Sequence, residues 1–307
     1  MALVVHVDTD IGGDPDDLCA LAMLLGWAGV ELAGVTTSTD EDGVRAGMAS
    51  YALGLSGRGA VPVAAGTAGS LGGLRVRPGF PDLSLHWPEP IHPEPSPPGA
   101  ALDLLAKNAT AGATIVCIGP WTNLALLETA RPGLLASTRV VVMCGYVRPP
   151  RPGLGQWTPE MDYNVQQDTV AARVVWERCA PVLVPLTAGL EARLRAAHLA
   201  RLEGGGDLSR LVARQGELQG VEEGMGRTGR KHPGLPDDLL NFHYDPLACA
   251  VAVGWDGARV EERRLRAREK DGVLTFPEEP GGRKTRVVTD VDGPRFEEDW
   301  LQAVAST

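Results

Sequence analysis

Near the start of the chain, five carboxylates fall within ten residues: Asp8, Asp10, Asp14, Asp16 and Asp17. An apolar run at residues 3–5 precedes them and another at residues 18–25 follows, which is typical of a strand, a tight loop and a helix. Helix capping would account for one or two of these acids. Five at the end of a buried strand cost free energy unless a cation or a substrate offsets their charge. We therefore expect a metal or sugar site here, and oxygen ligands favour Ca²⁺ or Mg²⁺ over Zn²⁺.

Composition and charge narrow the class of protein. The chain has 307 residues, 44% hydrophobic and 22% charged, an ordinary make-up for one sizeable α/β domain or two modest ones. The net charge of −10 argues against nucleic acid or an anionic membrane as a partner. The five cysteines form no CxxC pair and are expected to be buried thiols. No signal pattern and no apolar run of about 20 residues is present, so we expect a cytoplasmic protein without a membrane span.

Strand-like runs alternate with helix-length amphipathic segments over residues 3–187. Strands are expected at residues 3–7, 31–37, 61–66, 114–119, 139–145 and 181–187, and helices at residues 18–27, 43–55, 100–108, 122–130 and 168–179. Right-handed crossovers between such strands predict an α/β fold, with a mostly parallel central sheet of Rossmann-like topology and helices on both faces. In sheets of this kind ligands bind beyond the carboxyl ends of the strands, where the polar clusters of this chain fall.

The remaining segments are less regular. Residues 78–98 hold eight prolines, which predict a surface loop with His86 and His92 in solvent. Residues 196–241 are expected to form a helical flap beside the site. After a buried helix at residues 244–253, short C-terminal strands are expected at residues 259–266, 272–276 and 285–290, and a final helix at residues 295–304. The second half has no core pattern of its own, so one domain over residues 1–307 is predicted.

The acidic loop resembles the signature of the calcium-dependent nucleoside hydrolases of the inosine-uridine-preferring type: an Asp-x-Asp, a glycine, and a paired Asp-Asp that opens a helix. Five further blocks resemble that family in the same order: GVTT at residues 34–37, GPWTNLA at 119–125, MCG at 143–145, TPEMDYN at 158–164 and DPLA at 245–248. The resemblance covers roughly residues 3–300. Several ordered blocks are more specific than any single motif.

The resemblance implies an enzyme that cleaves a ribonucleoside to ribose and free base with a Ca²⁺-bound water. The implied Ca²⁺ ligands are Asp10, Asp17, Asp245 and the backbone carbonyl of Ile118. Asp10 would also be the general base that takes the proton of the attacking water. Relatives are commonly dimers or tetramers, so a homodimer or homotetramer is implied as well.

The substrate contacts implied by the resemblance come from several loops. Asp16 would accept the ribose 2′-hydroxyl, and Asp162 and Asn164 would hold the other hydroxyls. Gln156 stands where the family usually has Asn. Aromatic candidates for the base subsite are Trp87, Trp157 and Tyr244.

Two positions depart from the family pattern. Asp162 stands where most relatives have Glu, and Tyr244 stands where many have the His that protonates the leaving base. His243 lies one residue earlier, about 100° around a helix, and is interpreted as structural. The leaving-group acid could thus be His243, Tyr244 or neither.

Two other functions compete with a hydrolase. A haloacid dehalogenase-type phosphatase also ends its first strand in Asp-x-Asp, but it needs a downstream lysine, and none of the four lysines is well placed. Release of phosphate from a phosphoester in Mg²⁺ would favour it. A relative that binds ribose or a nucleoside without turnover is the non-enzyme alternative, motivated by Asp162 and Tyr244.

Overall fold

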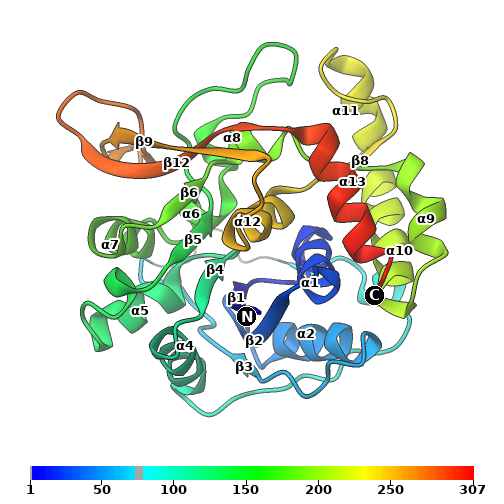
Figure 1. The fold of residues 1–307 in the computed structure, drawn as a ribbon, viewed down its shortest axis with the longest axis horizontal. Helices are drawn as coiled ribbons and strands as arrows, with labels where there is room; N and C mark the ends of the chain where they lie inside the picture. Colours follow the sequence, from blue (N-terminus) through cyan, green and yellow to red (C-terminus); the bar gives the residue numbers. More distant parts are fainter. Residues whose placement is uncertain (1, 73–78) are drawn as a thin grey trace.

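The computed structural model describes residues 2–72 and 79–307. Within these residues a central sheet of eight strands has the order β3-β2-β1-β4-β5-β6-β12-β9. The strands are β1 (Leu3–Thr9), β2 (Val30–Thr37), β3 (Val63–Ala65), β4 (Thr114–Cys117), β5 (Val140–Met143), β6 (Val182–Val184), β9 (Ala258–Leu265) and β12 (Arg283–Val291). Only β9 pairs antiparallel, with β12 at the edge (Figure 1). The predicted α/β fold with a mostly parallel sheet is confirmed.

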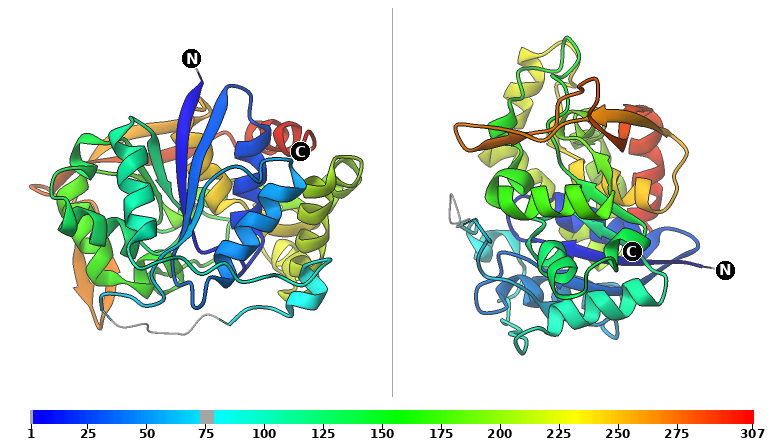
Figure 2. Two further views of the ribbon diagram at one scale, coloured as in Figure 1. Left: turned by 90° about the horizontal axis from the view of Figure 1, so that it is seen from below. Right: turned by 90° about the vertical axis from the view of Figure 1, so that its left-hand side faces the viewer.

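Helices cover both faces of the sheet (Figures 1 and 2). On one face lie α1 (Asp16–Gly26), α2 (Val44–Leu55), α12 (Tyr244–Ala252) and α13 (Gly293–Val304). On the other lie α4 (Ala100–Thr110), α5 (Thr122–Ala130) and α7 (Thr169–Cys179). Along β4, Val116 joins the first hydrophobic cluster, while Ile115 and Cys117 join the second. This alternation is that of a strand buried on both faces.

The tail completes the sheet. The prediction ended the series of sheet strands at residue 187, but β12 pairs parallel with β6 and carries β9 on its far side. Both strands are rich in charged residues and only partly buried, so they lack the apolar runs of the other sheet strands, and their place in the sheet is hidden in the sequence. The other short strands are β7 (Arg193–Arg195), β8 (Leu239–Phe242), β10 (Arg268–Lys270) and β11 (Val273–Thr275).

The flap region contains α9 (Leu199–Glu203), α10 (Asp207–Glu222) and α11 (Met225–Lys231), as expected for a helical segment. It ends in β8, which pairs antiparallel with β7, so the prediction of helix up to residue 241 is wrong at this end. Three short helices remain: α3 (Leu83–His86), α6 (Tyr163–Gln167) and α8 (Leu186–Gly189). Among the described helices, none is long and apolar enough to cross a membrane.

The proline-rich segment is fastened to the flap. Its first proline lies outside the described residues, and its helix α3 was not predicted. His86 is only 3% exposed and its Nε2 lies 3.1 Å from a carboxylate oxygen of Glu222 on α10, so the prediction of a solvated His86 is wrong. Trp87 is buried edge-on against Tyr51, with ring centroids 5.7 Å apart. This packing does not support the predicted place of Trp87 in the base subsite.

A buried polar chain joins α4 to β1 and β2. Asn108 Nδ2 donates to His6 Nδ1 (2.8 Å), His6 Nε2 donates to Thr36 Oγ1 (3.1 Å), and Thr36 Oγ1 donates to Asp8 Oδ1 (2.5 Å). This pattern requires the neutral imidazole, since Nδ1 accepts a hydrogen bond. Burial lowers the pKa of His6 from 6.5 to about 3.

The variant His6→Gln should reveal this neutral histidine through a pH-dependent stability difference. Because the folded pKa of His6 lies below the unfolded value, its contribution is complete above pH 6.5 and is lost as the pH falls toward 3. The unfolding free energy of the wild type minus that of the variant should shrink by about 1.4 kcal/mol per pH unit in this window. Urea unfolding of both proteins at several pH values measures the difference. A difference independent of pH would contradict the lowered pKa of His6, because the folded and unfolded proteins would then bind the same number of protons at this residue.

Candidate active site

The acidic loop positions two carboxylates at the start of α1. Thr9 Oγ1 donates to Asp17 and accepts from the backbone N–H of Ile11 (3.1 Å), which turns the chain out of β1. Asp14 Oδ1 accepts from the N–H of Asp16 at 3.0 Å. Asp16 and Asp17 thus occupy the first turn of a helix, where the dipole favours negative charge.

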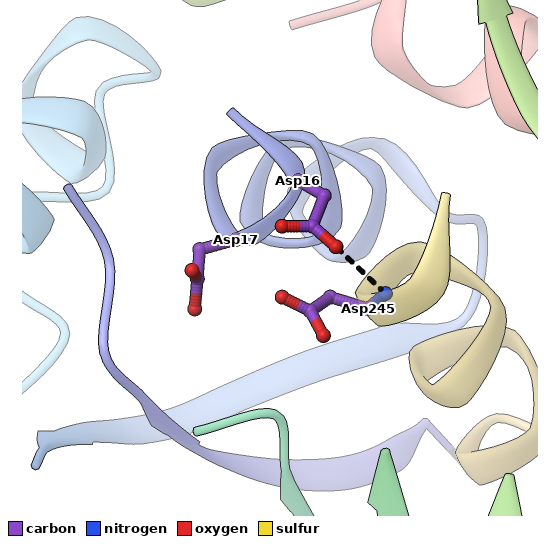
Figure 3. Close-up of side chains that lie close together, drawn as sticks. All are labelled: Asp16, Asp17 and Asp245. Atoms are coloured by element: carbon purple, nitrogen blue, oxygen red, sulfur yellow. Dashed lines mark hydrogen bonds between the residues drawn. The ribbon is translucent and has the colours of Figure 1, made fainter. Parts of the chain in front are cut away.

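A third carboxylate comes from a distant part of the chain. Asp245 lies in the first turn of α12, which packs against α1, and Figure 3 shows its carboxylate directed toward those of Asp16 and Asp17. One oxygen from each of the three lies within 4.8 Å of the others, and all three residues are buried. The N–H of Asp245 also donates to Asp16 Oδ2 at 3.4 Å. Burial, followed by repulsion among the carboxylates, raises the pKa of each well above its ordinary value.

Asp10 lies on the wall of the same cavity but outside this group of three. A Cβ at Gly119 would be only 2.8 Å from Asp10 Oδ1, so the turn after β4 must be glycine for Asp10 to hold its place. Burial raises the pKa of Asp10 to about 6, and the guanidinium of Arg45 opposes that shift.

The cavity has a volume of about 330 Å³. Its lining combines acidic and apolar side chains: Asp10, Gly13, Asp14, Asp16, Asp17, Arg45, Gly79, Ile118, Met143, Met161, Tyr163, Asn164, Leu186, Tyr244 and Asp245. It lies beyond the carboxyl ends of β1, β4 and β5, as expected for this class of sheet. Seven of the ten predicted site residues therefore meet here: Asp10, Asp16, Asp17, Ile118, Asn164, Tyr244 and Asp245.

Asn164 and Ile118 are in direct contact. Asn164 Nδ2 donates to the carbonyl of Ile118 at 2.7 Å and to that of Met143 at 3.2 Å. A carbonyl oxygen has two lone pairs, so Ile118 keeps one for a further partner. The amide oxygen of Asn164 remains as an acceptor on the cavity wall.

Three predicted substrate residues are not among those that line the cavity in the described chain. Gln156 is exposed in the loop that precedes α6. Asp162 is fully buried, and its carboxylate accepts from the N–H groups of Gly145 (2.7 Å) and Val165 (3.5 Å). Burial raises its pKa to about 7. Since Asp162 caps α6 and ties it to β5, the predicted contact of this residue with a sugar hydroxyl is not supported.

Trp157, the third of them, stands behind the cavity wall. Its Nε1 donates to the hydroxyl of Tyr244 at 3.1 Å, and its ring packs edge-on against Phe242. Trp157 therefore supports a cavity residue, and its predicted stacking on a base stays a prediction.

His243 faces the core. It is fully buried, with its ring centroid 4.1 Å from that of Trp300, and neither ring nitrogen has a hydrogen-bond partner among the described residues. Its placement agrees with the structural interpretation. In this fold the residue that faces the cavity is Tyr244.

Arg45 was missed by the sequence reasoning. It is 1% exposed, and it donates from Nε to the carbonyl of Thr39 (3.1 Å) and from Nη1 to those of Ile11 (2.8 Å) and Asp10. These hydrogen bonds hold the acidic loop in place. The positive charge of the guanidinium also compensates part of the negative charge in the cavity. The available signal was a single charged residue within the otherwise uncharged helix α2.

A family model described as inosine-uridine preferring nucleoside hydrolase matches residues 5–298. The chain belongs to this family. The pyrimidine-specific ribonucleoside hydrolase RihA of Salmonella paratyphi A is 33% identical over 234 residues, which cover 69% of this chain and 70% of that protein. RihA of Salmonella agona is also 33% identical, over 237 residues and with the same coverage.

Solved structures agree on the fold of this hydrolase. A plant nucleoside hydrolase, PpNRh1, aligns with a TM-score of 0.79 at 18% identity, covering 100% of both chains. The purine-preferring ribonucleoside hydrolase of Gardnerella vaginalis aligns with the same score at 19% identity and 98% coverage of each chain.

The chain is therefore an enzyme that hydrolyses the N-glycosidic bond of ribonucleosides, as the resemblance implied. The match to the nucleoside hydrolase family contradicts the phosphatase alternative. The family depends on a metal ion, and the buried group of Asp16, Asp17 and Asp245 is a suitable place for one.

Proposed function

We propose that this enzyme uses Ca²⁺, held by Asp10, Asp17, Asp245 and the carbonyl of Ile118, with Asp16 beside them. The observation that carries the proposal is the convergence of three buried carboxylates, whose oxygens lie within 4.8 Å of one another. Every donor in this set is oxygen, which suits a hard cation. Ca²⁺ accepts six to eight oxygen ligands, whereas Mg²⁺ retains several waters, so a wall rich in protein oxygens favours Ca²⁺.

When bound, such a cation would supply a water of lowered pKa and an anchor for vicinal sugar hydroxyls. Asp10 is the general base in this proposal: it takes the proton of the water that attacks the anomeric carbon. Its backbone is clamped by Arg45, and Gly119 leaves room for its carboxylate. Asp16 and the amide oxygen of Asn164 then accept hydrogen bonds from the ribose hydroxyls.

The base of the nucleoside would lie against the apolar part of the lining. Met143, Leu186 and Tyr244 contribute to this part. A volume of about 330 Å³ is within the range of small-molecule sites. Pyrimidine-specific and purine-preferring enzymes both occur among the relatives, so both classes of base belong in the test.

Release of reducing sugar from uridine, cytidine, inosine and adenosine tests this proposal. With Ca²⁺ present, ribose should be released from at least one of them, and removal of the metal by a chelator should reduce the rate by at least about 10²-fold, with recovery on adding Ca²⁺. Equal rates of ribose release with and without the chelator would contradict the proposed dependence on Ca²⁺.

We also propose that the chain forms one domain and acts as a homodimer or homotetramer in the cytoplasm. The match over residues 5–298 supports a single domain. The five free, buried cysteines support a reducing compartment. Light scattering of the purified protein would measure its mass against the 32.4 kDa of one chain.

A further inference from the structure

The ring of Tyr244 is held in a fixed slot on the cavity wall. A Cβ at Gly189 would lie 2.2 Å from Tyr244 Cδ1, so the ring packs directly on the backbone of α8. On another side the ring of Phe242 lies 5.6 Å away, centroid to centroid. The side chain can therefore turn little, and the direction of its hydroxyl is set by the fold.

The hydroxyl of Tyr244 has one proton left to donate. Trp157 Nε1 lies 3.1 Å from its oxygen, and an indole N–H can only donate, so the tyrosine oxygen is the acceptor of this bond. Among residues 2–72 and 79–307, no group accepts the proton of the Tyr244 hydroxyl. A fixed donor without an acceptor, on the wall of a substrate cavity, is free to bind a polar atom of the substrate.

Its neighbours indicate which part of the substrate that is. Asp245 follows Tyr244 in the chain and belongs to the carboxylates proposed to hold Ca²⁺ near the sugar. Tyr244 itself lies with Met143 and Leu186 on the apolar part of the lining, where the base is proposed to sit. His243, the neighbouring titratable side chain, is turned into the core against Trp300.

We propose that Tyr244, oriented by Trp157, donates a hydrogen bond to the leaving base as the N-glycosidic bond breaks. This inference rests on the proposed function. The bond between the anomeric carbon and the base nitrogen breaks, and its electron pair stays on the base. The water oxygen bonds to the anomeric carbon, and Asp10 takes the water proton. Tyr244 stabilises the negative charge that develops on the base, which takes up a proton from solvent after release.

Two variants and two kinds of leaving group test the proposal. Tyr244→Phe removes the hydroxyl and keeps the ring. Trp157→Phe removes the N–H that orients the hydroxyl and replaces the indole by a smaller aromatic ring, a loss of volume that the control below reproduces. Natural nucleosides need help with the departing base, whereas the nitrophenolate of 4-nitrophenyl β-D-ribofuranoside leaves without it. Trp255→Phe is the matched control, because Trp255 Nε1 donates to Asp299 (2.8 Å) outside the cavity.

Tyr244→Phe should lower kcat for uridine and inosine by about 10²-fold and change hydrolysis of the nitrophenyl riboside by less than about 3-fold. Trp157→Phe should lower kcat for the nucleosides by about 10-fold, but have almost no further effect in the Tyr244→Phe background, since the two act as a unit. Trp255→Phe should leave all rates within about 2-fold of the wild type.

The proposal would be overturned if Tyr244→Phe lowered kcat equally for the nucleosides and the nitrophenyl riboside, or did not lower it at all. Additive effects of Tyr244→Phe and Trp157→Phe on kcat would overturn it as well. If Tyr244→Phe fails to fold, the selectivity of Trp157→Phe between the two leaving groups decides in the same way. A wild-type enzyme that releases no sugar from either substrate would overturn the proposed function together with this inference. Wild-type turnover with parallel losses in the variants overturns this inference alone.

Discussion

Asp10→Asn should keep its fold and lose turnover of ribonucleosides by at least about 10³-fold. The amide has nearly the same shape as the carboxylate, and the contacts of Arg45 are to the backbone at this position, so the loop should persist. The amide cannot take a proton from water. Steady-state ribose release, with circular dichroism and melting temperature as checks on the fold, measures the effect.

Asp8→Asn is the matched control for Asp10→Asn. Asp8 lies two residues earlier, but its carboxylate accepts hydrogen bonds from Thr36 (2.5 Å) and Asn123 (2.8 Å) and is not among the lining residues of the described chain. The oxygen of an amide can accept both bonds, so turnover should stay within about 10-fold of the wild type. Turnover that survives in Asp10→Asn would show that another group is the base.

Asp17→Asn should change stability in opposite directions with and without Ca²⁺. In the metal-free enzyme the folded pKa of Asp17 is raised above its usual value, so its contribution to stability is lost as the pH rises through that folded pKa. At neutral pH the uncharged amide relieves this repulsion, and the variant should be the more stable protein. With Ca²⁺ at 100 times its Kd, the wild type should gain about 2.7 kcal/mol, which the variant should largely lack.

Thermal unfolding with a chelator, and with a series of Ca²⁺ concentrations, measures the stability difference between Asp17→Asn and the wild type under both conditions. Asp290→Asn, an exposed acid on β12, serves as the control and should follow the wild type under both conditions. A variant that is less stable than the wild type without metal, or that gains as much from Ca²⁺, would contradict the role given to Asp17.

The alternation of strands and helices was readable from the sequence, because strands buried on both faces are short apolar runs. The acidic loop could also be predicted from the sequence, because Asp10, Asp16 and Asp17 lie close together in the chain and one turn places all three on the same cavity. Asp245 was different. It reaches the cluster because α12 packs against α1, a contact between residues far apart in sequence that only the family resemblance indicated.

Side-chain partners were the hardest part to predict. Asp162 has the residue type of a sugar ligand, yet its carboxylate caps α6 and binds the N–H of Gly145. His86 looked solvated within a proline-rich loop, but α10 packs over it and supplies Glu222. Arg45 belongs to no recognisable sequence motif, because its partners are backbone carbonyls, which any residue type can supply. In each case the deciding contact comes from another element of the fold.

A titration of the metal-free enzyme with Ca²⁺ tests the central claim most directly, with ribose release from uridine and inosine followed at each addition. The buried carboxylate site predicts no turnover without metal, a rise that saturates at one Ca²⁺ per chain, and no recovery in Asp17→Asn at the same concentrations. Full turnover of the metal-free enzyme, or the same Ca²⁺ response in Asp17→Asn, would contradict it.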